Sequence, residues 1–184
     1  MWRHVLAMLL LATPALAQDT GAALWDRIYE VFSHPRCANC HVGPDSIPMW
    51  SGLGYGPGAR PHGMNIAGGE SRIGAQTIAC STCHTANNSQ LPHGPPGVAG
   101  WMLPPAEMQW FGKSSAEVCA QIKDRSRNGN RDTIAKVAEH VERAALVHWG
   151  WMPGPGREPA PYSAEQLVRF LKDWDAAGAP CPAQ

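Results

Sequence analysis

Two copies of the pattern Cys-x-x-Cys-His, at residues 37–41 and 80–84, are the part of this chain best suited to chemistry. In such a pattern the two thiols can add to the two vinyl groups of a haem, and the histidine that follows becomes an axial ligand of the iron. The sequence therefore predicts two covalently attached c-type haems, which contain iron. The predicted attachment and iron-binding residues are Cys37, Cys40, Cys80 and Cys83, with His41 and His84.

A zinc knuckle, a redox dithiol or coincidence could also produce these two patterns. Zinc sites pair two Cys-x-x-Cys units without a fixed histidine after each second cysteine. A dithiol of the thioredoxin type lies near a βαβ pattern, which this sequence lacks. Coincidence would account for one copy but hardly for two. The haem interpretation requires that the chain reach an oxidising compartment.

The N-terminus has the pattern of a cleavable signal peptide. Arg3 and His4 precede an apolar run over residues 5–12, which is too short to span a bilayer, and residues 15–17 form an Ala-x-Ala cleavage site. We therefore expect residues 1–17 to be removed on export and residues 18–184 to form a single domain in the periplasm. An uncleaved membrane anchor is the alternative. No later segment is apolar enough to span a membrane.

A mainly α-helical chain with long loops follows from composition and periodicity. The 19 glycines and 17 prolines among 184 residues exceed average usage. Apolar spacing and end signals predict a helix over residues 23–32, directly before the first motif, and three C-terminal helices over 114–128, 131–149 and 163–177. Glycine- and proline-rich loops would wrap the haems. Because only 43 residues separate Cys37 from Cys80, we expect one compact dihaem domain of the cytochrome c kind.

The sixth ligand of each iron is expected to be a methionine. Met64 follows His41 by 23 residues and Met108 follows His84 by 24, each late in a glycine- and proline-rich loop. A loop methionine can equally be an apolar gap-filler. The rivals are His62 for the first iron and His140 for the second.

Two cysteines, Cys119 and Cys181, are left over from the motifs. Because an even number of cysteines remains and the compartment is oxidising, the two are expected to form a disulfide. It would join a middle helix to the C-terminus. Two separate buried thiols are the alternative.

Loop arginines and tryptophans are expected to contact the propionates and the porphyrin faces of the haems. The guanidinium fork matches carboxylates, so Arg60, Arg72 and Arg157 are candidates to pair with haem propionates, although each could be a solvated surface charge. Loop tryptophans would pack on porphyrin faces. The formal net charge of zero gives no basis for nucleic-acid binding.

The order of landmarks resembles that of exported dihaem cytochromes c found beside molybdenum hydroxylases of the isoquinoline 1-oxidoreductase type. The resemblance rests on both motifs and on residues 61–65, 103–110 and 149–159. It implies an electron carrier, not an enzyme, that takes electrons from a dehydrogenase and passes them to a cytochrome or oxidase of the respiratory chain. A small dihaem enzyme, of the peroxidase or thiosulfate-oxidising kind, is the alternative function.

Overall fold

Six helices and four very short strands make up the regular structure of the described residues. The computed structural model describes residues 20–52, 58–75, 77–91 and 94–183, so the predicted signal segment lies outside them. The predicted class, mainly α-helical, is confirmed for the described residues. The helices are α1 (Gly21–Phe32), α2 (Pro35–Ala38), α3 (Ser115–Lys123), α4 (Ile134–Arg143), α5 (Ala145–His148) and α6 (Ala164–Ala176); the strands are β1 (Met49–Trp50), β2 (Arg60–Pro61), β3 (Gly74–Ala75) and β4 (Ile78–Ala79).

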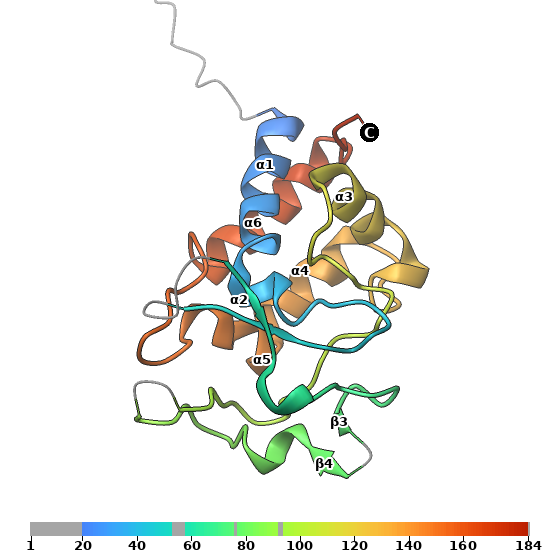
Figure 1. The fold of residues 1–184 in the computed structure, drawn as a ribbon. Coiled ribbons are helices and arrows are strands. Elements are labelled where there is room, and N and C mark those ends of the chain that lie inside the picture. Colours follow the sequence, from blue (N-terminus) through green and yellow to red (C-terminus); the bar gives the residue numbers. More distant parts are fainter. Residues whose placement is uncertain (1–19, 53–57, 76, 92–93, 184) are drawn as a thin grey trace, which may run out of the picture.

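The core lies among α1, α3, α4 and α6, at one end of the molecule (Figure 1). The apolar stripe predicted for the first helix is buried and packs on α6, which also packs on α4. At the centre of this contact the Trp25 and Trp174 rings lie 4.9 Å apart, and both side chains are fully buried. Each large apolar side chain removed from water contributes about 1.5–3 kcal/mol. The four helices therefore have a conventional core of their own.

Side-chain caps fix the beginnings of α3 and α6, as the sequence predicted. Ser114 accepts a hydrogen bond from the Glu117 backbone N–H, and the Glu117 carboxylate accepts one from the Ser114 backbone N–H. Ser163 and Gln166 form the same reciprocal pair at α6. Each box satisfies two backbone donors that the helix itself leaves without partners.

Two of the predicted helices are shorter than expected. The helix after Ser114 ends at Lys123 rather than near Asn128, because Asp124 caps a separate short turn and the Asn128 side chain donates to the carbonyl of Ile122. The helix predicted over residues 131–149 is broken at Ala144, whose backbone is extended (φ −80°, ψ 114°). The break divides it into α4 and α5 and turns the chain toward the loops.

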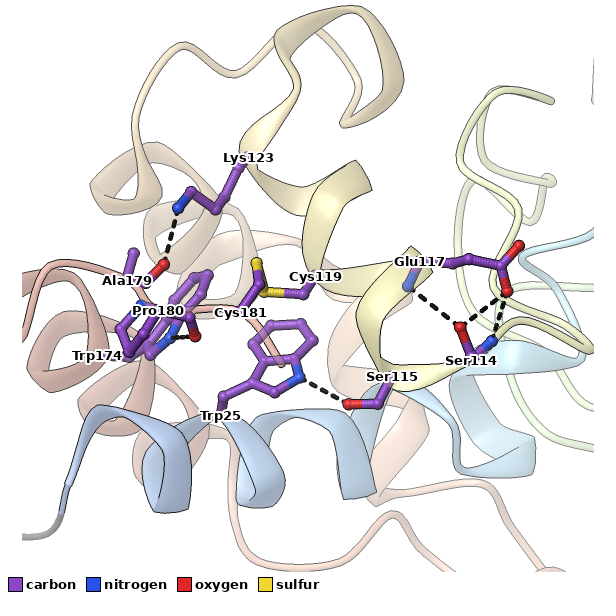
Figure 2. The surroundings of a disulfide bond; sticks show 10 residues. All are labelled: Trp25, Ser114, Ser115, Glu117, Cys119, Lys123, Trp174, Ala179, Pro180 and Cys181. Carbon is purple, nitrogen blue, oxygen red and sulfur yellow. Dashed lines mark hydrogen bonds between the residues drawn. A yellow bond between two sulfur atoms is a disulfide. The ribbon is translucent and has the colours of Figure 1, made fainter. Parts of the chain in front are cut away.

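The predicted disulfide between Cys119 and Cys181 is present (Figure 2). It joins α3 to the chain end across 62 residues, with the two Cα atoms 5.7 Å apart. Two further bonds hold the same terminal segment: Lys123 Nζ donates to the Ala179 carbonyl at 2.8 Å, and Trp174 Nε1 donates to the Pro180 carbonyl at 3.0 Å. The C-terminus is thereby fixed against the helical core.

The described residues between 43 and 102, the loop segment, extend toward the other end of the molecule (Figure 1). Two short antiparallel hairpins, β1–β2 and β3–β4, provide its only strands within the described ranges. None of its described aliphatic, aromatic, methionine or cysteine side chains is buried. Instead the buried guanidinium of Arg72 donates to the carbonyls of Val42, Gly43 and Pro104. Several large apolar side chains of the segment are exposed: Ile47, Met64, Ile73, Ile78, Leu91 and Met102.

No helix within the described ranges is long and apolar enough to cross a membrane.

Candidate haem-attachment sites

The first Cys-x-x-Cys-His motif begins inside α2, directly after α1, as predicted. His34 caps α2 by accepting a hydrogen bond from the Arg36 backbone N–H, and Pro35 occupies the first turn, where its missing N–H costs nothing. Cys37 and Cys40 are half-buried and not bonded to one another. Burial raises the pKa of the Cys37 thiol to about 12 and that of Cys40 to about 11. Both are therefore protonated at neutral pH, unlike the low-pKa thiol of a redox dithiol.

His41 is held in one orientation by a backbone carbonyl and a tryptophan. Its Nδ1 lies 3.0 Å from the Met108 carbonyl oxygen. The Trp110 ring stacks on the imidazole, with ring centroids 3.4 Å apart and planes inclined by 2°. Because a carbonyl can only accept, Nδ1 carries the proton and Nε2 keeps its lone pair. Burial lowers the pKa of His41 to about 3, so the ring is a neutral potential ligand at physiological pH.

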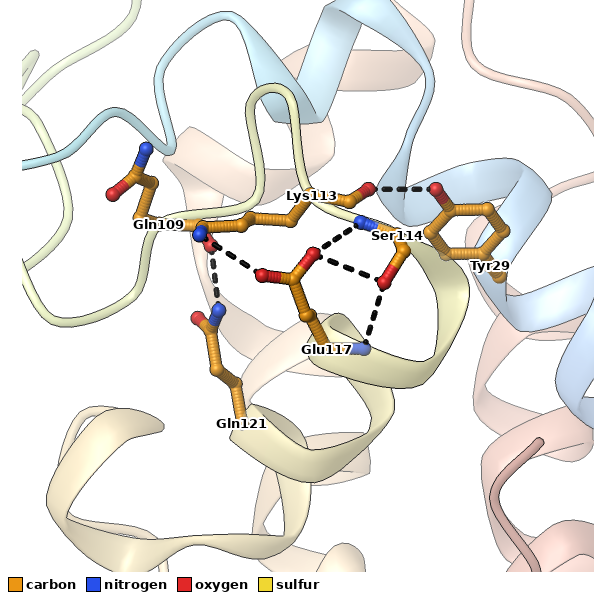
Figure 3. Close-up of polar contacts among 6 residues, drawn as sticks. All are labelled: Tyr29, Gln109, Lys113, Ser114, Glu117 and Gln121. Atoms are coloured by element: carbon orange, nitrogen blue, oxygen red, sulfur yellow. Dashed lines mark hydrogen bonds and ion pairs between the residues drawn. The ribbon is translucent and has the colours of Figure 1, made fainter. Parts of the chain in front are cut away.

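The helical core holds the segment that orients His41. The backbone N–H groups of Trp110 and Phe111 donate to the His41 carbonyl at 2.9 and 3.0 Å. Figure 3 shows how the flanking residues are fixed: Tyr29 Oη donates to the Lys113 carbonyl and Gln121 Nε2 donates to the Gln109 carbonyl. The residues that contact His41 are therefore anchored by α1 and α3.

The second motif repeats this arrangement with different elements. Cys80 opens a short 3₁₀ turn directly after β4, and Cys83 is exposed. His84 Nδ1 lies 2.8 Å from the Pro96 carbonyl oxygen, and Trp101 stacks on the His84 ring at 4.5 Å with a 6° inclination. Burial again lowers the histidine pKa. His84 thus also keeps a lone pair on Nε2.

A hollow of about 440 Å³ opens beside His84. Its walls are mostly apolar and come from both sides of the second motif. They include Ile73, Ala79, Val98, Trp101 and Met102. An apolar hollow beside a histidine whose lone pair is free suits a large apolar group that contains a metal.

The candidate sixth ligands lie in contrasting surroundings. Met64 is 80% exposed in the 3₁₀ turn Gly63–Asn65, whereas the Met108 side chain is buried in the helical core beside Gly129. His140 lies on α4, and a positive charge on its ring would contribute to lowering the pKa of His41. Ligation of iron by Met64 and by Met108 stays a prediction.

The candidate propionate-binding arginines also differ from one another. Arg60 is exposed on β2, opposite Trp50. Arg157 Nη2 donates to the Gly94 carbonyl at 2.7 Å and so ties the C-terminal chain to the loop segment. The Arg72 guanidinium donates to protein oxygens through all three of its nitrogens, which indicates a structural role.

Arg36 was not among the arginines chosen from sequence. Its guanidinium is buried, with Nη2 donating to the Ser51 carbonyl at 2.8 Å and Nε finding no partner among the described residues. The indole N–H of Trp110 is also buried and has no hydrogen-bond partner among the described residues. Two buried donors beside the first motif fit the carboxylates of a haem. Its position could have identified Arg36 from the sequence, because it immediately precedes Cys37.

The described part of the chain has no group of side chains that could hold a metal ion by itself. No three histidine, cysteine, aspartate or glutamate side chains gather there in a way that could hold an ion. A zinc knuckle would need four such ligands together. A c-type haem needs only two thiols and one histidine from each motif, and the surroundings described above fit that requirement.

Comparison with protein-family models, with curated proteins and with solved structures gives no significant match.

Proposed function

We propose that this protein is an exported dihaem cytochrome c that carries electrons between other proteins. The observation that carries the proposal is the repeated histidine environment. In both motifs Nδ1 faces a backbone carbonyl, a tryptophan stacks on the ring and Nε2 keeps its lone pair. Fixing the tautomer of a ligating histidine through such a carbonyl is a recurrent feature of metal sites.

The exposed apolar side chains of the loop segment support the same proposal. A segment of this length whose described residues bury no aliphatic, aromatic, methionine or cysteine side chain gains little from the hydrophobic effect to offset the entropy of ordering its backbone. A covalently held haem would supply a large apolar surface on which these side chains can pack. The loop would then be stabilised by its cofactor.

In this proposal each residue has a defined role. The thiols of Cys37 and Cys40 attach one haem and those of Cys80 and Cys83 the other, while His41 and His84 are the proximal ligands. Arg36, Arg60 and Arg157 are candidates to balance propionate charge. When bound, each haem supplies a one-electron Fe(III)/Fe(II) couple. Met64 is the predicted sixth ligand of the first iron, and Met108 is the candidate that spacing offers for the second.

The proposed partners follow from the stated resemblance to dihaem cytochromes associated with molybdenum hydroxylases. The donor would be a dehydrogenase, and the acceptor a cytochrome or oxidase of the respiratory chain. The signal-like N-terminus supports a periplasmic location. An enzymatic role of the thiosulfate-oxidising kind is disfavoured, because Cys119 and Cys181 are bonded to one another and neither is free to ligate an iron.

The test is to compare electron exchange with peroxide turnover in the purified holoprotein. A carrier with both irons six-coordinate should be reduced and reoxidised rapidly by small redox mediators and should consume peroxide slowly. A ferric spectrum that contains a high-spin haem, together with fast peroxide turnover, would replace the carrier with the enzyme. Absence of any haem spectrum would overturn both functions.

A further inference from the structure

His62, which belongs to the loop after the first motif, lies beside the histidine of the second motif. The ring centroids of His62 and His84 are 6.0 Å apart and their planes are inclined by 56°. His62 is held in place through its backbone, because its N–H donates to the Pro48 carbonyl at 2.8 Å and its neighbour Pro61 pairs with Met49 in the β1–β2 hairpin. The loop of one motif therefore brings an imidazole to the other.

The Nδ1 atoms of both rings face backbone carbonyl oxygens. His62 Nδ1 lies 2.9 Å from the Gly63 carbonyl oxygen, and His84 Nδ1 lies 2.8 Å from that of Pro96. Because a carbonyl oxygen can only accept, Nδ1 carries a proton in both rings. Within the part of the chain that the structure describes, neither Nε2 makes a hydrogen bond.

The separation of the two rings fits a metal between them. A histidine nitrogen binds a metal at about 2 Å, and the ring centroid lies roughly 1 Å beyond that nitrogen, so two imidazoles on opposite sides of one iron have centroids about 6 Å apart. The observed 6.0 Å agrees with this value.

We propose that His62 is the sixth ligand of the iron whose proximal ligand is His84. The inference rests on the proposed haem function and deepens it. The second haem is then a bis-histidine centre closed by the loop of the first motif, and the two motifs form one interlocked unit. This assignment replaces Met108 on the second iron.

Two of the three rival methionines, Met108 and Met64, are less well placed for this iron. Met108 is buried in the helical core, and its own carbonyl binds His41. Met102, in contrast, lines the same hollow as His84 and is 41% exposed. Met64 is two residues beyond His62 but is 80% exposed.

The test uses electron paramagnetic resonance of the full-length ferric holoprotein, in which each low-spin haem gives its own signal. His62→Gly, His84→Gly and His41→Gly are compared with the wild type, and His148→Gly is the matched control. The proposal predicts that His62→Gly and His84→Gly remove the same low-spin signal, while His41→Gly removes the other and the control removes neither. Loss of the same signal in His62→Gly and His41→Gly, or no loss in His62→Gly, would overturn it.

A second variant keeps the proposal testable should a glycine variant fail to fold. His62→Met exchanges one ligand for another, and because a thioether favours ferrous iron it should raise the reduction potential of one haem and create a methionine–iron charge-transfer band. An unchanged potential and spectrum would exclude His62 as a ligand. A wild type that contains two haems but fails these tests refutes only the ligand assignment, whereas a wild type without covalent haem refutes the proposed function itself.

Discussion

The helical part of the molecule (residues 20–42 and 103–183) and the loop segment (residues 43–102) reach order in opposite ways. The helical part buries Trp25, Leu171 and Trp174 completely and adds a disulfide. The loop segment has no buried aliphatic, aromatic, methionine or cysteine side chain among its described residues and relies on Arg72 and backbone hydrogen bonds. The helical part is stabilised by its own side chains, and the contrast agrees with the proposal that the loop segment would be stabilised by a bound haem.

The two motifs lie on opposite sides of this division. Trp110, which stacks on His41, also stacks on Phe32 with centroids 4.5 Å apart, so the first motif is continuous with the helical core. The second motif lies within the loop segment, and Trp101 connects it to the helical part through an edge contact with Trp149. We therefore expect the two motifs to depend unequally on their haems.

The largest effect should come from preventing haem attachment at the second motif. In the variant Cys80→Ser/Cys83→Ser, amides of the loop segment should exchange with solvent roughly a hundredfold faster or more, because the segment loses the apolar surface that orders it. Amides of α1, α4 and α6 should keep their protection. Hydrogen exchange followed by mass spectrometry measures both regions at once.

The matched variant at the first motif sharpens the comparison. Cys37→Ser/Cys40→Ser should also weaken protection near α2, because this motif is continuous with the core. If the second-motif variant leaves the loop segment as protected as in the wild type, the segment does not depend on its haem.

A smaller effect is expected from removing the disulfide. Cys119→Ala/Cys181→Ala should lower the free energy of unfolding of the helical part by about 4 kcal/mol, the chain-entropy value for a loop of this length. The loop segment should keep its exchange rates, because the bridge lies in α3 and the C-terminus. Denaturant titration of tryptophan fluorescence measures the first quantity. Equal losses in both regions would show that they unfold as one unit.

Much of the helical part could be predicted from sequence because its signals are local. The apolar stripe of α1 and the two capping boxes each lie within a few residues. The break at Ala144 could not be predicted in this way, since no glycine or proline marks it. The motifs identified His41 and His84, but their carbonyl and tryptophan partners depend on how distant loops return. His62 shows the same limit, because the sequence made it a rival ligand for the first iron, whereas the fold places it beside the second motif.

The smallest effect concerns the capping box of α3. The Ser114 backbone hydrogen bond, followed by the bond from Lys113, lowers the pKa of Glu117 from 4.5 to about 2. A carboxylate with a lowered folded-state pKa stabilises the fold above its unfolded pKa, and this stabilisation is lost as the pH falls from about 4.5 toward 2. Glu117→Gln should therefore be slightly less stable than the wild type at pH 6, with the difference vanishing near pH 2. Urea titrations at several pH values measure it, and a constant difference would contradict the pKa assignment.

The most direct measurement of the central claim is the mass of the intact exported protein, followed by mapping of its peptides. The account predicts a chain that begins at Gln18 and carries two haems, one on the peptide with Cys37 and Cys40 and the other on the peptide with Cys80 and Cys83. A mass that corresponds to the bare chain, or to one haem only, would contradict it.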